Sequence, residues 1–142
     1  MLKKINFFLA IILFANTAIS QNKDEIAITD ILNKQTFAWN TGNIESFMQG
    51  YWQSDSLKFI GKSGITYGWQ KTLDNYKKNY PDITAMGKLD FTILDTKRLS
   101  ALYYFVVGKW HLARNTGDIG GYFTLLFKKI KKNWLIVVDH SS

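Results

Sequence analysis

Histidine is the side chain best suited to transfer a proton near neutral pH. The chain has two histidines, His111 and His140, and Asp139 directly precedes the second. Because successive residues of a strand point to opposite faces, the segment 134–140 places Trp134 and His140 on one face and Asp139 on the other. If Trp134 faces the core, His140 faces the same side, where a pocket could open. His140 is therefore the predicted general acid or base, and a structural role for a lone terminal histidine stays open.

Aromatic side chains could form a second kind of site, an apolar wall against which a ligand packs. They make up 15% of the chain, and many gather between Tyr51 and Tyr80. Aromatic rings supply a large, rigid surface, and a tyrosine hydroxyl can donate a hydrogen bond to a ligand. Each ring could equally be ordinary core. The predicted ligand-binding residues are Trp39, Tyr51, Trp52, Phe59, Trp69, Tyr76 and Trp110.

Several other kinds of site are excluded or not indicated. The absence of cysteine excludes disulfides, thiolate metal ligands and cysteine nucleophiles. Two histidines without carboxylates at ligand spacing do not form a metal motif. The glycines around Lys62 and Ser63 indicate a tight loop and match no phosphate-binding or dinucleotide motif. We therefore predict no metal and no cofactor.

The chain is basic, with a formal net charge of +7. Its lysines are scattered, and those near residues 128–132 fall at a strand end and a turn, not along one helix. This pattern is typical of a solvated surface. We predict no nucleic-acid partner.

The N-terminus resembles a signal peptide. Lys3 and Lys4 are followed by an apolar run, and the small residues around Ile19 fit a cleavage site before Gln21. The run is too short for a comfortable membrane span of about 20 residues. We predict a signal peptide over residues 1–20, a single domain over 21–142 with no integral membrane segment after processing, and a periplasmic or secreted location.

Hydrophobic periodicity predicts helices in the first half of this domain. Apolar residues at helical spacing indicate a helix over residues 23–40 and a second that begins at Ile44. Between them Gly42 suits a left-handed helix terminator and Asn43 an N-cap. A third helix opens after Gly68 and stops at Pro81.

Alternation replaces helical periodicity from about residue 86, which indicates strands. They are expected near residues 57–60, 65–67, 89–94, 101–114, 122–130 and 134–140. The strand 101–114 is apolar on both faces in its middle, so it is expected to be central and covered on both sides. Leu102, Gly108, Trp110 and Leu112 should share one face, and Gly108 could mark a bend. Helices followed by long strands predict an α+β fold.

The order of these elements and several local strings resemble a known superfamily. The strings include Thr41–Asn43, Tyr51–Trp52, Gly68–Trp69 and Gly108–Leu112, followed by the final strand up to Ser142. They are similar to the SnoaL-like, nuclear transport factor 2-like superfamily, and within it to the group called domain of unknown function 4440, related to the association domain of calcium/calmodulin-dependent kinases. The resemblance covers the whole predicted domain.

The resemblance implies a cone of about three helices packed on a strongly curved, mixed or antiparallel sheet. It also implies an apolar pocket between the two and a homodimer formed through the outer sheet face. Ketosteroid isomerases of this superfamily carry a catalytic acid on the first strand after the helices. The corresponding segment here, Leu57–Ile60, has no acid, which argues against isomerisation of that type. Apart from the resemblance, Asp139 is expected to pair with Arg114 or a lysine across strands, which is a structural role.

Three functions remain open at this stage, because a fold does not determine an activity. The first is an exported domain that binds a small hydrophobic or aromatic molecule. The second is an enzyme of the isomerase, dehydratase or cyclase type that uses His140. The third is a dimeric assembly module whose outer sheet face carries Tyr103, Phe105, Val107 and His111.

Overall fold

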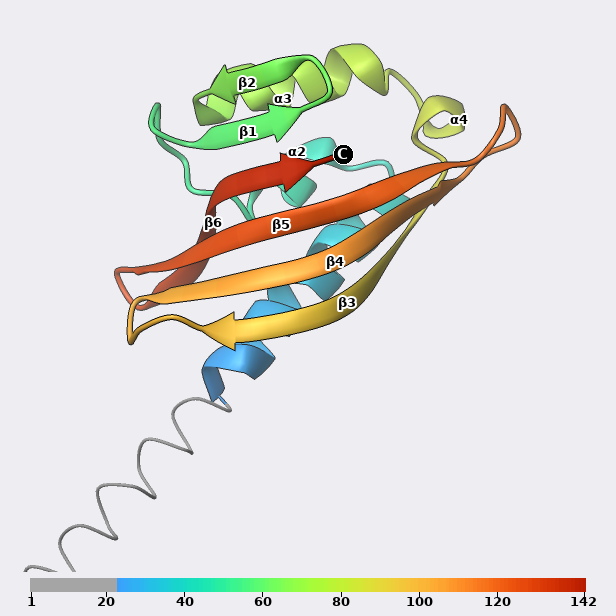
Figure 1. Cartoon of the computed structure of the whole chain (residues 1–142). Coiled ribbons are helices and arrows are strands. Elements are labelled where there is room, and N and C mark those ends of the chain that lie inside the picture. The colour runs from blue at the N-terminus through green and yellow to red at the C-terminus, as the bar shows by residue number, and fades with distance from the viewer. Residues whose placement is uncertain (1–22) are drawn as a thin grey trace, which may run out of the picture.

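The computed structural model describes residues 23–142, and the predicted signal peptide lies outside this range. The predicted α+β fold is confirmed, with helices packed on one six-stranded mixed sheet (Figure 1). The strand order is β2-β1-β6-β5-β4-β3. The strands are β1 (Lys58–Gly61), β2 (Gly64–Tyr67), β3 (Lys88–Arg98), β4 (Tyr103–Ala113), β5 (Ile119–Ile130) and β6 (Asn133–Ser141).

The first helix covers residues 23–40 and packs its apolar side, including Ile28 and Leu32, into the core. Asn40 fixes its end to β3, because its side chain donates to the Leu89 carbonyl and accepts from the Leu89 amide. Gly42 follows with a φ of 76°, as predicted for a left-handed terminator.

Three shorter helices complete the helical layer. They are α2 (Ile44–Met48), α3 (Trp69–Asn79) and α4 (Ile83–Met86). Asn43 caps α2 by accepting from the Ser46 amide at 2.8 Å, which confirms its predicted role. The fourth helix was not predicted. It follows Pro81, and Asp82 caps it through the Ala85 amide.

The sheet pairs its strands antiparallel except at one place, where β1 runs parallel to β6. This pair joins the small β1–β2 hairpin to the long strands, with α3 lying beside the hairpin (Figure 1). The strand β3 extends four residues beyond the predicted end at residue 94, with a register shift between Ile93 and Asp95. The extra residue lets the strand bend and continue.

A second register shift, in β6, decides which side chains face the helices. Leu126 pairs with Val138 while the next residue, Phe127, pairs with Ile136, so Val137 is an extra residue in β6. Ile136 and Val137 are both buried. Such a bulge reverses the facing of every later residue in the strand. Asp139 and Ser141 consequently face inward.

The core lies between the inner sheet face and the first helix, α2 and α3. As predicted, Gly108 and Leu112 share the inner face of β4 with the half-buried Trp110, whereas Leu102 lies before the strand and is exposed. None of the helices in the described part of the chain has the length and apolarity that a membrane crossing requires.

Candidate functional site

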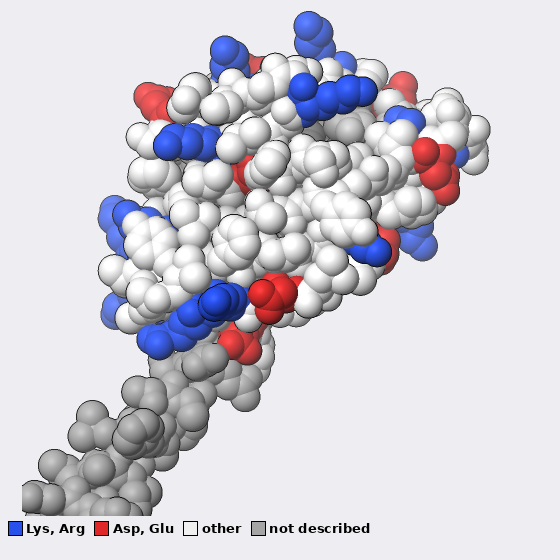
Figure 2. Space-filling view, viewed as in Figure 1, with Lys and Arg blue, Asp and Glu red and all other residues white. Residues whose placement is uncertain are grey.

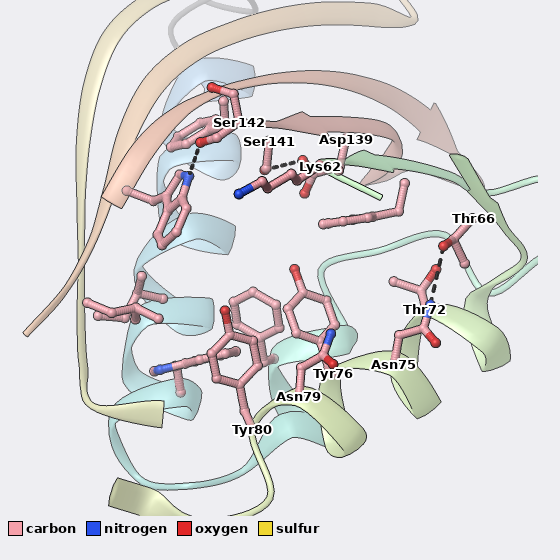
Figure 3. Close-up of a pocket in the computed structure, with 18 of the residues that line it drawn as sticks. Lys62, Thr66, Thr72, Asn75, Tyr76, Asn79, Tyr80, Asp139, Ser141 and Ser142 are labelled. Carbon is pink, nitrogen blue, oxygen red and sulfur yellow. Dashed lines mark hydrogen bonds between the residues drawn. The ribbon is translucent and has the colours of Figure 1, made fainter. Parts of the chain in front are cut away.

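A cavity of about 830 Å³ opens between α3, the β1–β2 hairpin and the inner face of the long strands (Figure 3). Rings from every side line it, and polar groups enter from α3 and from the end of β6. The aromatic side chains that line it are Trp39, Phe47, Tyr51, Phe59, Tyr76, Tyr80, Phe91, Trp110 and Phe123.

Asp139 is the only acidic side chain among the residues that line this cavity, and it is 3% exposed. It reaches the cavity because it follows the bulge in β6, between Phe59 of β1 and Leu125 of β5 in the sheet. Its Oδ2 accepts a hydrogen bond of 2.7 Å from the Tyr51 hydroxyl, and its Oδ1 accepts one of 2.7 Å from the Ser141 hydroxyl.

Burial determines the acidity of this carboxyl group. Removal from water raises the pKa of Asp139 to about 6, and the hydrogen bonds from Tyr51 and Ser141 only partly offset that rise. The group therefore changes charge near neutral pH. A carboxyl group with such a pKa in a cavity can accept or donate a proton, or bind a cationic or hydrogen-bonding ligand.

Two tyrosines extend the hydrogen-bonded group away from Asp139. Tyr51 shares a side-chain hydrogen bond with Tyr76 of α3. Burial raises the pKa of both hydroxyls well above the ordinary tyrosine value, and the nearby Asp139 charge raises them further. Both therefore remain neutral hydrogen-bond donors at physiological pH.

Backbone contacts hold Tyr51 beside β6. Tyr51 forms a parallel bridge with Ile136, and the Ile136 amide donates to the Gly50 carbonyl at 2.9 Å. The Trp52 amide donates in turn to the Ile136 carbonyl at 2.9 Å. The segment after α2 therefore behaves as a short extension of the sheet, which places the hydroxyl next to the carboxylate.

Five of the seven predicted ligand-binding residues line the cavity, namely Trp39, Tyr51, Phe59, Tyr76 and Trp110. Trp52 and Trp69 do not. The Trp69 indole donates to the Met48 carbonyl at 2.9 Å and packs against the core, so the aromatic cluster divides between cavity wall and structural packing.

The predicted orientation of His140 is wrong. The extra residue in β6 turns His140 to the outer sheet face, where it pairs with Thr124 of β5 and is exposed. Asp139 takes the inward position that simple alternation assigned to His140. A catalytic role for His140 loses its geometric basis.

The expected ion pair of Asp139 is also not formed. Its partners are Tyr51 and Ser141, and the ion pairs found within residues 23–142 involve other acids. His111 lies on the outer face of β4 as predicted and contacts Asp118 at 3.1 Å. No three His, Cys, Asp or Glu side chains of this range form a group that could hold a metal ion.

Sequence reasoning missed the polar groups of the cavity other than its tyrosines. Ser141 and Asp139 were hidden by the bulge, while Asn75 and Asn79 of α3 lie one helical turn apart and face the cavity from its helical side. Their i, i+4 spacing, in register with Tyr76 and Tyr80, is the signal that could have identified them.

The fold and the cavity together define a small α+β pocket domain. A crystal structure of a nuclear transport factor 2-like protein of unknown function from Shewanella oneidensis MR-1 is 44% identical in sequence, with 84% of this chain and 98% of that chain covered and a TM-score of 0.81. This chain therefore belongs to the nuclear transport factor 2-like family.

More distant structures share the fold alone. The crystal structure of LinA is 15% identical, with 88% of each chain covered and a TM-score of 0.74. A protein from Xanthomonas campestris described as a calcium/calmodulin-dependent protein kinase II association domain is 15% identical, with 81% of this chain and 84% of that chain covered and a TM-score of 0.62. No protein-family model matches this sequence, and no curated protein matches it.

Proposed function

We propose that this protein binds a small molecule with an apolar or aromatic body in the cavity between α3 and the sheet. The observation that carries the proposal is the aromatic-lined cavity of about 830 Å³ with one buried acid. Ligand sites typically occupy roughly 300–1,000 Å³ and combine apolar walls with a few placed polar groups.

The walls of this cavity are supported without a ligand. Trp39 packs edge-on against Phe47, Tyr76 and Tyr80, with ring centroids 5.2, 5.9 and 4.9 Å apart. The Trp39 indole also donates to the Met86 carbonyl at 3.1 Å. Rings that are already fixed cost less entropy to order when a ligand binds, which favours binding.

A screen by thermal shift, with native mass spectrometry of the purified protein, tests this proposal. We expect a retained or stabilising molecule whose effect falls in Trp110→Ala, because Trp110 lines the cavity. Trp52→Ala is the matched control, since it removes another half-buried indole that does not line the cavity. An equal loss in both variants would show that binding occurs elsewhere or that the loss is structural.

A second candidate function is proton-transfer catalysis, with Asp139 in the role predicted for His140. The observation that favours it is a carboxyl group of pKa about 6 that accepts a hydrogen bond from Tyr51 inside the cavity. With any substrate that the screen identifies, Asp139→Asn should abolish turnover and His140→Ala should retain it. The reverse result would restore His140 as the catalytic group.

The outer sheet face supports a third proposal, a homodimer. Figure 2 shows few charged side chains in the middle of the visible face, with lysine and arginine along its edges. Phe105 pairs with Leu126, and Leu126 pairs with Val138, so three half-buried apolar side chains lie side by side across β4, β5 and β6. A second copy would remove this apolar surface from water.

Light scattering at micromolar concentration tests the dimer. We expect a mass of twice the chain, reduced to one chain in Leu126→Lys. The control is Ile83→Lys, at a residue of the helix α4 that is 73% exposed and is not part of the sheet. A wild-type monomer would remove this proposal and leave the cavity proposals intact.

We also infer that the protein is exported through the segment 1–20 to the periplasm or the medium. The basic start, the apolar run and the small residues before Gln21 support this inference. Mass spectrometry of the protein from its native host should show an N-terminus at Gln21, and an intact Met1 would contradict it.

A further inference from the structure

We propose that the ligand of the cavity carries a protonated amine, which binds the Asp139 carboxylate while its apolar body packs against the aromatic wall. This inference rests on the proposed small-molecule binding and specifies the chemical class of the ligand. It depends on three features of the described residues: a buried acid without a cationic partner, rings around that acid, and free lone pairs on its oxygens.

The first feature is the missing cation. Asp139 is 3% exposed, and within residues 23–142 no lysine or arginine forms an ion pair with it. Buried carboxylates are normally paired with a cation or neutralised, since an isolated buried charge is costly. A ligand ammonium group would supply the missing positive charge.

The second feature is the set of rings around the acid. Tyr51 contacts Asp139 through its hydroxyl, and Phe59 is the neighbour of Asp139 on β1. Tyr76 packs edge-on against Phe59 with a centroid distance of 5.7 Å. The faces of such rings attract a cation within roughly 6 Å. A cation beside Asp139 would lie next to the carboxylate and among these rings, whereas an anion there would be repelled by the carboxylate.

The third feature is the remaining hydrogen-bond capacity of Asp139. Each carboxylate oxygen accepts one hydrogen bond, Oδ2 from Tyr51 and Oδ1 from Ser141. A carboxylate has about four lone-pair sites, so each oxygen can accept a further N–H. An ammonium group carries three donors and matches this capacity better than a hydroxyl group, which has one.

The ionisation of Asp139 determines how this binding should depend on pH. Its pKa of about 6 leaves it mainly ionised at neutral pH. Tyr51, on the segment after α2, and Tyr76 of α3 remain neutral because their pKa values are raised. His140 of the same strand faces outward and lowers the pKa of Asp139 when it is charged, while Phe59 and Leu125 on the flanking strands do not titrate.

The lysines of the cavity, Lys62 and Lys78, could be thought to select an anion instead. Lys62 is exposed in the β1–β2 turn, and Lys78 is exposed on α3. Neither is among the charges that perturb the Asp139 pKa. At ordinary salt the charges of these exposed lysines are screened over about 10 Å, so they attract or repel a ligand less strongly than a buried carboxylate does.

Isothermal titration of the purified protein with three probes of the same aromatic body tests the amine. The probes are 2-phenylethylamine, 2-phenylethanol and phenylacetate, which differ mainly in the charge and donors at one end. The variants are Asp139→Asn, which removes the charge at nearly constant shape, and Tyr51→Phe, which retains the carboxylate. Lys71→Gln, at an exposed lysine of α3 that does not line the cavity, controls for charge outside the site.

We expect the wild type to bind the amine about tenfold or more tightly than the alcohol, since a charge-assisted hydrogen bond is stronger than a neutral one. The preference should vanish in Asp139→Asn and persist in Lys71→Gln. In Tyr51→Phe, which removes a hydrogen-bond donor to the carboxylate, the pH at which amine binding is lost should rise. Lowering the pH from about 7.5 to about 5 should weaken amine binding about tenfold and leave alcohol binding unchanged, because about a tenth of Asp139 then remains ionised.

Each other outcome contradicts a defined part of the reasoning. If the alcohol or phenylacetate binds as tightly as the amine, the cavity proposal stands and the amine is excluded. If the affinity of the wild type for the amine does not change with pH, Asp139 is not the partner of the amine. This result does not depend on whether any variant folds. If none of the three probes binds, the amine inference fails, while the thermal-shift screen decides separately whether the cavity binds a small molecule.

Discussion

Asp139 should make the stability of this protein depend on pH in the direction opposite to most carboxylates. Burial raises its pKa from 3.8 to about 6 in the folded protein. The folded state therefore holds a proton at Asp139 at pH values where the unfolded chain has lost it. The stabilisation from this group is complete below about pH 4 and is lost as the pH rises through about 6.

The magnitude follows from the two pKa values. Raising the pKa from 3.8 to about 6 corresponds to about 3 kcal/mol between full protonation and full ionisation. About 2 kcal/mol of this difference in stability falls between about pH 4.5 and about pH 7.5. In Asp139→Asn the side chain stays neutral at every pH, so this part of the pH dependence should disappear.

The assay is urea unfolding of the wild type and Asp139→Asn at several pH values across this window. The free energy of unfolding of the wild type, relative to that of the variant, should fall by about 2 kcal/mol as the pH rises. Using the difference between the two proteins cancels the carboxylates that they share. Among these, Asp24 has a lowered pKa, because hydrogen bonds from Lys129 and Trp134 outweigh its burial.

Asp118→Asn is the matched control. Asp118 accepts a hydrogen bond from the Arg114 amide, which lowers its pKa, and it is exposed. Its stabilising contribution should therefore be lost as the pH falls, the opposite sign to that of Asp139. Parallel stability profiles for the wild type and Asp139→Asn would refute the reasoning, since they would show that Asp139 is ionised normally in the folded protein.

Three further substitutions test individual contacts by the shift in urea midpoint. Tyr51→Phe removes a donor to the buried acid, so it should cost about 1–2 kcal/mol and move the pH-dependent window upward. Gly108→Ala should cost about 1–3 kcal/mol, because the new Cβ would overlap Cζ of the Phe123 ring. No loss of stability would show that the ring can move aside. Lys129→Met should cost about 1 kcal/mol, because it breaks the 2.9 Å contact with Asp24. If the stability losses of Lys129→Met and Asp24→Asn simply add in the double variant, the two side chains are not coupled.

The sequence was sufficient to predict the fold because several local patterns agree with one another. Gly42 and Asn43 carry the chemistry of a helix end and a helix start, and both adopt those roles. The long alternating segments became β3 to β6 in one sheet. The short helix α4 was missed because four residues are too few for a hydrophobic period to appear.

The candidate site was predictable only in part, for a reason that lies in β6. Residues 135–138 are all apolar, so their pattern contains no alternation that could reveal an extra residue. The bulge becomes apparent only from pairing with β5, where Phe127 aligns with Ile136. The aromatic wall was easier to predict, because its rings come from several helices and strands. Their positions therefore do not depend on the register of β6 alone.

The same bulge links the architecture to the chemistry. Without the extra residue at Val137, β6 would present His140 to the cavity and Asp139 to solvent, and the buried acid would not exist. With the extra residue, the Asp139 carboxylate of β6 lies beside Phe59 of the neighbouring strand β1. The cavity therefore has an acid although β1 itself has none. The absence of an acid from the segment 57–60 is thus a weak argument against proton-transfer chemistry in this protein. The argument has to be made from the three-dimensional position of Asp139, because adjacent strands can supply the same cavity with a carboxylate.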